Sequence, residues 1–369
     1  MIIMALDELF DKVKEGNISR RNVLKIGIGV GVGLVGLGAA GCTTPTPTGT
    51  ATPLPTVAAT AAPLKSMSGI GHLPSDHHAA LFIANSKGTD GKSIFDKHGL
   101  TVTATSINTG PGILQQLEGG SIDIALAGVP PTISSIDKPE STTKIVAAVQ
   151  SNGSGIIVSK NFDISGLTDV KSKVEFLKGK KIAIPSAGSI QDIMLRELFK
   201  KYGIDYSKEN ITPVAAGQQV GAVQAGTQDA AINWEPFVST AVVKGAANVL
   251  LRSEDIWPNH PCCCVSTSTA MIKNYPDTLE AFFLAMKEAN DYILANPADS
   301  AKIVAAAIQG DDVAIETEAM PHIAFLVKPD ETFLSGSETY AKTMKDLGLV
   351  KTLHDRNDLF DLTLVNKTL

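Results

Sequence analysis

Three of the four cysteines in this 369-residue chain are consecutive, at Cys262, Cys263 and Cys264. The fourth, Cys42, stands alone, so no spaced pairs define a disulfide framework. Alternation along a strand turns Cys262 and Cys264 away from Cys263, which separates the sulfur atoms that a metal would need together. We therefore predict that the three are small, buried side chains on a strand.

Three histidines, His72, His77 and His78, lie early in the predicted folded region. His77 and His78 are adjacent and lack a companion one helical turn away, the spacing that places two metal ligands on one helix face. We therefore predict no bound metal, and nothing in the sequence indicates another cofactor. His72 directly follows a predicted first strand, and we predict that it contacts a ligand.

Two glycine-containing turns, at residues 108–114 and 186–189, precede predicted helices. The first N–H groups of a helix have no intrahelical partner, and its N-terminus carries a partial positive charge, so both turns suit an anion. A serine just before a helix can instead serve only as its cap, which leaves two interpretations open for Ser189. The predicted ligand-binding residues at these turns are Thr109, Gly110, Ser186, Ser189 and Gln191.

Trp234 and Glu235 follow an apolar run and are predicted to lie on a strand-to-helix turn. The indole would cover an apolar part of a ligand, and the carboxylate would pair with an amine. The alternative is a packed tryptophan beside a carboxylate that caps a helix. No Gly-x-Ser-x-Gly elbow and no nucleophile–base spacing is present in the sequence, so we do not expect an enzyme.

Short apolar runs alternate with helical patterns from about residue 64 onward, which predicts an α/β protein. Helices are expected over residues 190–202 and 278–294, where apolar residues recur on one face. The predicted strands are 100–104, 122–126, 144–149, 155–158 and 181–184. With 32 Lys and Arg against 38 Asp and Glu, the net charge of -6 argues against a nucleic-acid partner.

Residues 1–41 have the pattern of an export signal, with Arg20 and Arg21 ahead of a short apolar stretch. The arginine pair is similar to a twin-arginine signal, and the small residues before Cys42 resemble a lipoprotein processing site, so Cys42 is the predicted lipid attachment residue. Residues 42–65 are rich in Thr and Pro, which predicts an extended tether. We expect a protein anchored by lipid on the outer face of the cytoplasmic membrane.

Several motifs recur in an order and spacing typical of one protein family. They are GHLP at 71–74, DKHGLTV at 96–102, GSIDIA at 120–125, GVPP at 128–131, LKGKKIAIP at 177–185, GSIQD at 188–192, DAA at 229–231 and WEPF at 234–237. Together they resemble the nitrate, sulfonate and taurine branch of ABC-transporter solute-binding proteins. This resemblance implies ligand contacts at Gly128, Val129 and Pro130.

The resemblance also implies a type II periplasmic-binding-protein fold, in which two α/β lobes are joined by two crossover strands around a ligand cleft. We expect one lobe over residues 66–155 and 265–369 and the second over 156–264, with chain crossings near 155–158 and 263–266. The protein would act as a monomer, close around its solute by a hinge motion, and deliver it to permease and ATPase subunits.

A small oxyanion-bearing solute, led by a sulfonate such as taurine, is the expected ligand. Nitrate or bicarbonate is the next candidate, followed by a thiamine-type pyrimidine. The cysteine trio resembles part of the cysteine-rich motif of the thiamine-pyrimidine synthases, but Val265 and Ser266 stand where that motif continues with an aromatic residue and another cysteine. An exported enzyme on the same fold is the remaining alternative.

Overall fold

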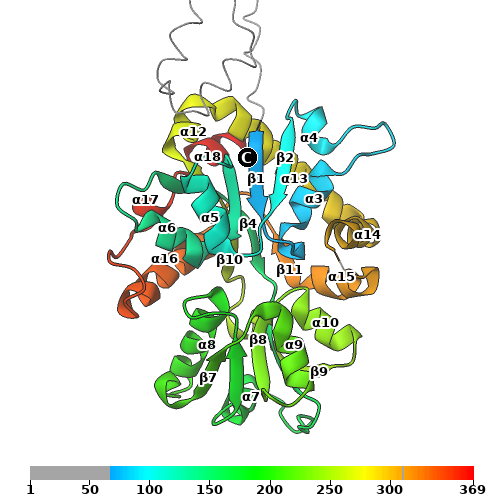
Figure 1. Cartoon of the computed structure of the whole chain (residues 1–369), viewed down its shortest axis with the longest axis vertical. Coiled ribbons are helices and arrows are strands. Elements are labelled where there is room, and N and C mark those ends of the chain that lie inside the picture. Colours follow the sequence, from blue (N-terminus) through cyan, green and yellow to red (C-terminus); the bar gives the residue numbers. More distant parts are fainter. Residues whose placement is uncertain (1–66, 310) are drawn as a thin grey trace, which may run out of the picture. The chain divides into compact units, whose positions relative to one another are not determined.

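Two mixed β-sheets organise the residues that the computed structural model describes, which are 67–309 and 311–369. Each sheet has helices packed around it and forms the centre of one lobe (Figure 1). The predicted signal, tether and Cys42 lie outside the described residues. Among the described residues, no helix is both long enough and apolar enough to cross a bilayer.

The first sheet has six strands in the order β11-β4-β10-β3-β1-β2. β1 pairs in parallel with β2 and β3, whereas β10 runs antiparallel to β3 and β4, and β11 runs antiparallel to β4. The strand bounds are β1 Met67–His72, β2 Val102–Ser106, β3 Ile124–Gly128, β4 Thr143–Asn152, β10 Pro261–Ser268 and β11 Ile323–Phe325.

The second sheet has five strands in the order β7-β6-β8-β5-β9. β6 pairs in parallel with β7 and β8, and β5 runs antiparallel to β8 and β9. The bounds are β5 Ser154–Ser159, β6 Lys181–Ile184, β7 Asn210–Pro213, β8 Ala230–Trp234 and β9 Ala247–Arg252.

Helices of the first lobe come from the beginning and the end of the described chain. They are η1 Asp76–His78, α3 Ala79–Asn85, α4 Ile94–Lys97, α5 Gly110–Glu118, α6 Val129–Ile136, α12 Thr269–Asn274, α13 Pro276–Ala295, α14 Pro297–Ala307, α15 Val313–Ala319, η3 Met320–His322, α16 Glu331–Asp346, α17 Arg356–Leu359 and α18 Thr363–Thr368. Those of the second lobe and its exit are α7 Val170–Phe176, α8 Ile190–Lys201, η2 Tyr206–Lys208, α9 Ala216–Gln224, α10 Phe237–Val243 and α11 Ser253–Ile256.

The predicted elements agree with this arrangement. α8 and α13 match the two expected helices to within two residues, and every predicted strand overlaps an observed one. All residues of β3 and β5 are buried, because helices and neighbouring strands cover both faces of these strands. Their central residues, 124–127 and 156–158, are accordingly continuous apolar runs instead of an alternating pattern.

The chain passes between the two sheets twice. The first passage is a tight turn at Asn152 and Gly153, whose φ angles of 64° and 79° are both in the left-handed region. The second lies in residues 253–260, between β9 and β10. It precedes the expected crossing near Cys263, because Cys264 is already inside the first sheet, opposite Ala127 of β3.

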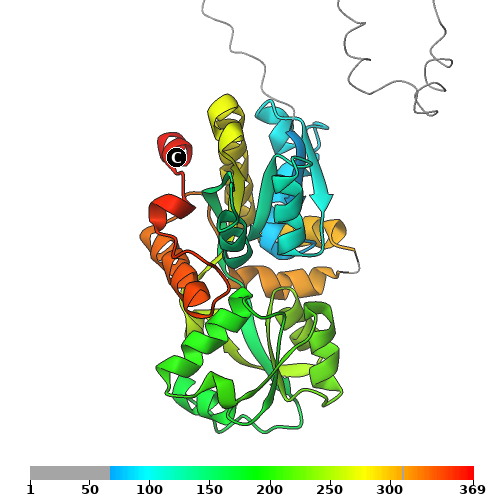
Figure 2. The same cartoon turned by 60° about the vertical axis from the view of Figure 1, so that its left-hand side comes forward.

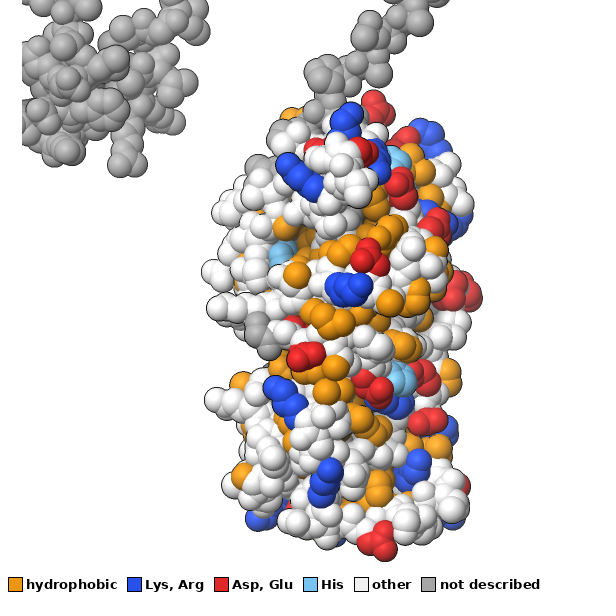
Figure 3. Space-filling view, turned by 90° about the vertical axis from the view of Figure 1, so that its right-hand side faces the viewer, with side chains coloured by type: hydrophobic (Ala, Val, Ile, Leu, Met, Phe, Trp, Pro, Cys, Tyr) orange, Lys and Arg blue, Asp and Glu red, His pale blue; other side chains and the backbone are white. Residues whose placement is uncertain are grey.

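α15 lies at the junction of the two lobes, where it packs against α10 of the second lobe (Figures 1 and 2). On the face shown in Figure 3, basic and acidic side chains are interspersed among apolar ones. This mixed surface agrees with the near balance of charges in the sequence.

Candidate ligand-binding cavity

A cavity of about 780 Å³ lies between the two lobes, and both lobes contribute to its wall. The lining comes largely from turns at the carboxyl ends of six strands: β1, β2 and β3 of the first sheet, and β6, β7 and β8 of the second. In open α/β sheets this edge is the usual place for a ligand, because the connections that leave it can diverge around a crevice. The cavity is therefore the candidate site.

The lining contains few ionisable side chains. None of the residues that line this cavity is Lys, Arg, Asp or Glu, and its titratable groups are the imidazole of His77 and the thiols of Cys262 and Cys263. A ligand held here must be recognised through hydroxyls, amides, backbone groups and apolar contacts.

The turn before α5 forms part of the first-lobe wall. Thr109 is the N-cap of α5, and its Oγ1 accepts a hydrogen bond of 3.2 Å from the backbone N–H of Gly112. Asn108, Thr109, Gly110 and Pro111 all line the cavity. Both predicted residues of this turn thus lie at the cavity wall.

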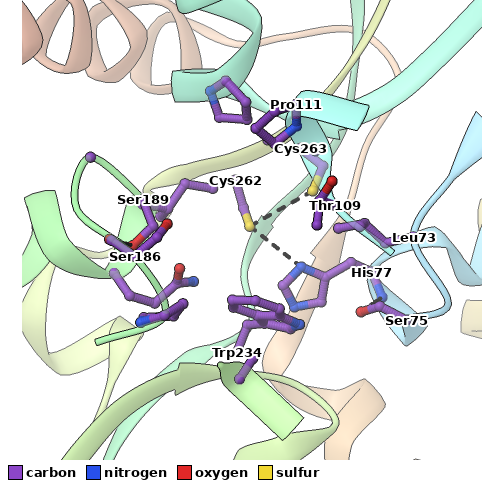
Figure 4. A pocket seen from close by; sticks show the side chains of 18 of the residues that line it. Leu73, Ser75, His77, Thr109, Pro111, Ser186, Ser189, Trp234, Cys262 and Cys263 are labelled. Atoms are coloured by element: carbon purple, nitrogen blue, oxygen red, sulfur yellow. Dashed lines mark hydrogen bonds between the residues drawn. The ribbon is translucent and has the colours of Figure 1, made fainter. Parts of the chain in front are cut away.

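The turn before α8 forms the facing wall of the second lobe, with Ser186 and Ser189 at the cavity (Figure 4). Gly188 has a φ of +75°, a conformation that side chains rarely adopt. Ser189 caps α8, since its Oγ accepts from the N–H of Asp192 at 3.2 Å and donates to the carbonyl of Ser186 at 2.8 Å. Gln191 also lines the cavity, and its amide donates to Ser154 Oγ at 3.0 Å.

Trp234 closes the lower end of the cavity in the view of Figure 4. It ends β8, and its ring meets that of Phe237 edge-on, with the centroids 5.8 Å apart. Phe237 lines the cavity too, so this wall presents aromatic surface to a ligand.

Glu235 does not line this cavity, which corrects its prediction as a ligand-binding residue. Its side chain is fully buried, pairs with Arg252, and accepts a hydrogen bond of 2.8 Å from the N–H of Ser239 in α10. Burial raises the pKa of Glu235, and the charge of Arg252 opposes that shift. The capping alternative describes this carboxylate better than the amine-binding one.

Three further predicted residues lie outside the lining: His72, Val129 and Pro130. His72 is buried with its ring edge-on to Phe82, and its Nδ1 donates to the carbonyl of Leu73 at 2.8 Å. Burial lowers the pKa of His72. Val129 and Pro130 begin α6 and are buried, whereas the preceding Gly128 remains at the wall.

The structure brings His77, Cys262 and Cys263 together at the cavity, which corrects the expectation that strand alternation separates the sulfur atoms. The register of β10 against β4 shifts on both sides of Cys263, so strict alternation is lost there. Cys262 Sγ lies 4.0 Å from Cys263 Sγ and 3.4 Å from His77 Nδ1 (Figure 4). All three side chains are buried, in agreement with the predicted burial of the cysteines.

These contacts change the pKa values of His77 and Cys262. Burial opposes a charged imidazole, but the charge and hydrogen bond of Cys262 raise the pKa of His77 to about 9. Burial likewise opposes a thiolate, yet the hydrogen bond from Cys263 and the charge of His77 hold the pKa of Cys262 well below its usual value. Both shifts favour an imidazolium–thiolate pair over a neutral imidazole and thiol.

The first passage between the lobes positions His77. Its Nε2 donates to the carbonyl of Gly153 at 3.0 Å. A Cβ at position 153 would lie only 2.8 Å from that nitrogen, so the close approach and the positive φ both require glycine.

As a metal centre, His77, Cys262 and Cys263 offer three donor atoms that all lie within 4.8 Å of one another. A nitrogen and two sulfurs suit a soft divalent ion with one open position. An imidazolium cannot ligate, however, because a metal needs the neutral ring nitrogen. With the pKa of His77 at about 9, a metal would have to displace the proton of this ring at neutral pH.

Several lining residues were not predicted, including His77, Asn108, Phe237, Cys262 and Cys263, together with Met344 and Leu349 from the end of α16 and the loop after it. Asn108 and Phe237 flank predicted residues and would have been found by extending the two turns. His77 and Cys262 are 185 positions apart, and no spacing in the sequence indicates their contact.

Comparison with known proteins places these features in context. The model of the NMT1-like family matches residues 61–309. A protein of Brucella abortus (strain 2308), named provisionally as a binding protein, is 27% identical over 62% of this chain and 68% of its own length. The 4-amino-5-hydroxymethyl-2-methylpyrimidine phosphate synthase of Aspergillus parasiticus is 27% identical over 60% of this chain and 64% of its own length.

Among solved structures, the periplasmic aliphatic sulphonate binding protein of Escherichia coli superposes with a TM-score of 0.68 at 18% identity, covering 80% of this chain and 92% of that one. This likeness confirms the predicted fold class, an α/β type II periplasmic-binding-protein fold.

Proposed function

Because the chain belongs to the NMT1-like family, we propose that it is the solute-binding component of an ABC importer and that its solute is a small, uncharged heteroaromatic ring of the pyrimidine type. The fold class, which it shares with a sulphonate-binding protein, supports the binding role. The observation that carries the choice of solute is the cavity wall, which is aromatic and polar but without charged carboxylate, ammonium or guanidinium groups.

A pyrimidine fits this wall because it needs one stacking surface and a few neutral hydrogen-bonding groups. Trp234 supplies the stacking surface, and Ser186, Asn108 and Thr109 supply hydroxyl and amide groups from both lobes. A ring held between the two walls would contact both, which is the differential binding that hinge closure requires. Sulfonate, nitrate and bicarbonate need compensation for a full negative charge. No Lys or Arg lines the cavity, and the imidazole of His77 is already engaged by Cys262.

Relatives also support this choice. The Aspergillus parasiticus protein takes its name from a substituted pyrimidine phosphate. Cys262–Cys264 of this chain resemble part of the cysteine-rich motif of the thiamine-pyrimidine synthases. Val265 and Ser266 replace the remainder of that motif, and we propose that this chain binds such a ring without converting it. The export signal and a lipid on Cys42 would place it outside the cytoplasmic membrane, beside its permease.

Calorimetric titration tests the proposal. We expect 4-amino-5-hydroxymethyl-2-methylpyrimidine to bind with 1:1 stoichiometry and to raise the melting temperature, whereas taurine, nitrate and bicarbonate do neither. Mass spectrometry of the recovered ring should show it unchanged. Binding of taurine in preference to the pyrimidine would refute the choice of solute, and a converted ring would favour an enzyme.

Trp234 gives the sharpest variant. Loss of stacking in Trp234→Ala should weaken pyrimidine binding by about tenfold or more, since stacking on an aromatic side chain contributes about 1 to 3 kcal/mol. The matched control is Trp257→Phe, because Trp257 is the only other tryptophan, lies outside the cavity lining and packs on Tyr340. Equal losses in both variants would mean that the effect is on folding.

A further inference from the structure

The N-terminus of α8 is the part of the second-lobe wall best suited to an anion, and the carboxylate of Asp192 already occupies it. α8 has 12 residues, and the turn before it lines the cavity at Gly188 and Ser189. Without another partner, the N–H groups and partial positive charge of this end would favour a negatively charged ligand group.

Asp192 removes that preference. Its Oδ2 accepts from the N–H of Gly188 at 2.8 Å, and its Oδ1 accepts from Arg196 Nε at 2.9 Å and from the hydroxyl of Tyr206. The carboxylate is fully buried. The Gly188 N–H is therefore directed at Asp192, and a full negative charge lies in the first turn of the helix.

Two further donors of this turn are engaged as well. Ser189 N–H donates to the carbonyl of Ser186 at 3.2 Å, and the Ser189 hydroxyl donates to the same carbonyl. The cation that balances Asp192 is Arg196, which lies one turn further along α8, packs over the ring of Tyr206 at 3.8 Å and does not line the cavity. The side chain of Asp192 does not line the cavity either, so any effect on a ligand acts through the N-terminus of α8.

We propose that Asp192 is a specificity-determining residue that excludes anionic groups from the second-lobe wall. The solute must then be uncharged at this end, so the protein takes a free heteroaromatic alcohol and rejects its phosphate ester, as well as sulfonates. This inference rests on the proposed function, since it concerns the ligand of the same cavity. It does not require Asp192 to touch the ligand.

The test is a gain of anion binding in Asp192→Asn, measured by calorimetry with methanesulfonate and inorganic sulfate as probes. Asparagine keeps an oxygen for the Gly188 N–H but removes the charge. We expect no detectable binding of either probe by the wild-type protein, and in the variant an affinity at least about tenfold above that detection limit, because removal of the carboxylate leaves the partial positive charge of the helix N-terminus to the probe. If Asp192→Asn folds poorly, Asp192→Ser provides a second test, because serine is small and is tolerated in the first turn of a helix.

Two controls separate the local effect from a general one. Asp205→Asn removes the same charge from the exposed cap of η2 and should gain nothing. Combining Asp192→Asn with Arg196→Gln should retain the gain if the helix N-terminus holds the anion. Loss of the gain in the double variant would assign it to the freed guanidinium and overturn the proposal.

The pyrimidine titration distinguishes this proposal from the proposed function. If wild type binds the pyrimidine but Asp192→Asn gains no anion affinity, the role of Asp192 is wrong and the function stands. If neither protein binds the pyrimidine while Asp192→Asn gains anions, the solute is wrong and the role of Asp192 stands. Wild-type protein that binds methanesulfonate as tightly as the variant does would overturn the role of Asp192 directly.

Discussion

Individual side chains at the cavity are largely engaged with one another, and this limits what they can offer a ligand. Ser189 is occupied by Ser186 and Asp192, and His77 is held between Cys262 and Gly153. Trp234, by contrast, presents its ring to the cavity (Figure 4). Recognition at the residue scale should therefore depend more on aromatic surface than on the serine caps.

Ser189→Ala should lower the free energy of unfolding by about 1 kcal/mol through loss of the α8 cap. Ligand affinity should not change, because the hydroxyl already donates to Ser186 and accepts from Asp192. Denaturant unfolding measured beside calorimetric titration checks both parts. A loss of affinity of tenfold or more, about the value of a hydrogen bond to a charged ligand group, would restore the anion site predicted at this turn.

Removal of metal by dialysis against a chelator should leave the melting temperature and ligand affinity unchanged. The physical reason is that a metal would have to displace the proton of the His77 ring, whose pKa is raised to about 9. Elemental analysis before and after dialysis provides the measurement. Stoichiometric zinc or iron that disappears in Cys263→Ser would show instead that His77, Cys262 and Cys263 form a metal site.

At the scale of elements, α15 ties the lobes together through charged side chains. Its Glu318 pairs with Arg252 of β9 at 3.2 Å, and the same guanidinium pairs with Glu235. Glu316, on the buried face of α15, is fully buried. Burial, followed by the charges of Asp76 and Asp311, raises the pKa of Glu316 to about 12. The junction of the lobes therefore contains a carboxyl group that stays protonated at neutral pH.

Glu316 should make the protein less stable as the pH rises. Below about pH 4 the group is protonated in both states, but above it the unfolded chain ionises while the folded one does not, which favours unfolding up to pH 12. Glu316→Gln lacks this effect, so its stability relative to wild type should grow by up to about 1.4 kcal/mol per pH unit. Urea unfolding of both proteins at pH 5 and pH 8 measures the difference. A difference that is the same at both values would contradict the raised pKa.

At the scale of the molecule, the proposed function needs a membrane anchor as well as two lobes around a cavity. Labelled lipid should be incorporated into the full chain and lost in Cys42→Ala, since the thiol of Cys42 is the proposed attachment point. Cys263→Ser is the matched control and should retain the label, because its sulfur is buried in β10. Labelling that persists in Cys42→Ala would refute the anchor.

The sequence by itself determined the α/β class, the position of α8 and α13, and the turns that carry Thr109, Ser186 and Trp234 to the cavity. Each of these depends on local patterns: apolar periodicity, helix caps, and glycine or proline at turns. The order of the motifs also predicted two lobes around a cleft, since it indicated a family whose fold is known.

Only the tertiary structure decided which polar groups are free at the cavity. The contact of His77 with Cys262 depends on an irregular register in β10, and the burial of Glu235 depends on Arg252 from another strand. The sequence shows Asp192 only as a carboxylate in the first turn of a helix. Its hydrogen bonds with Gly188, Arg196 and Tyr206 are seen only in the tertiary structure. Each donor can make only a limited number of hydrogen bonds. A donor predicted to bind a ligand is therefore available only if it is not already hydrogen-bonded to an acceptor within the fold.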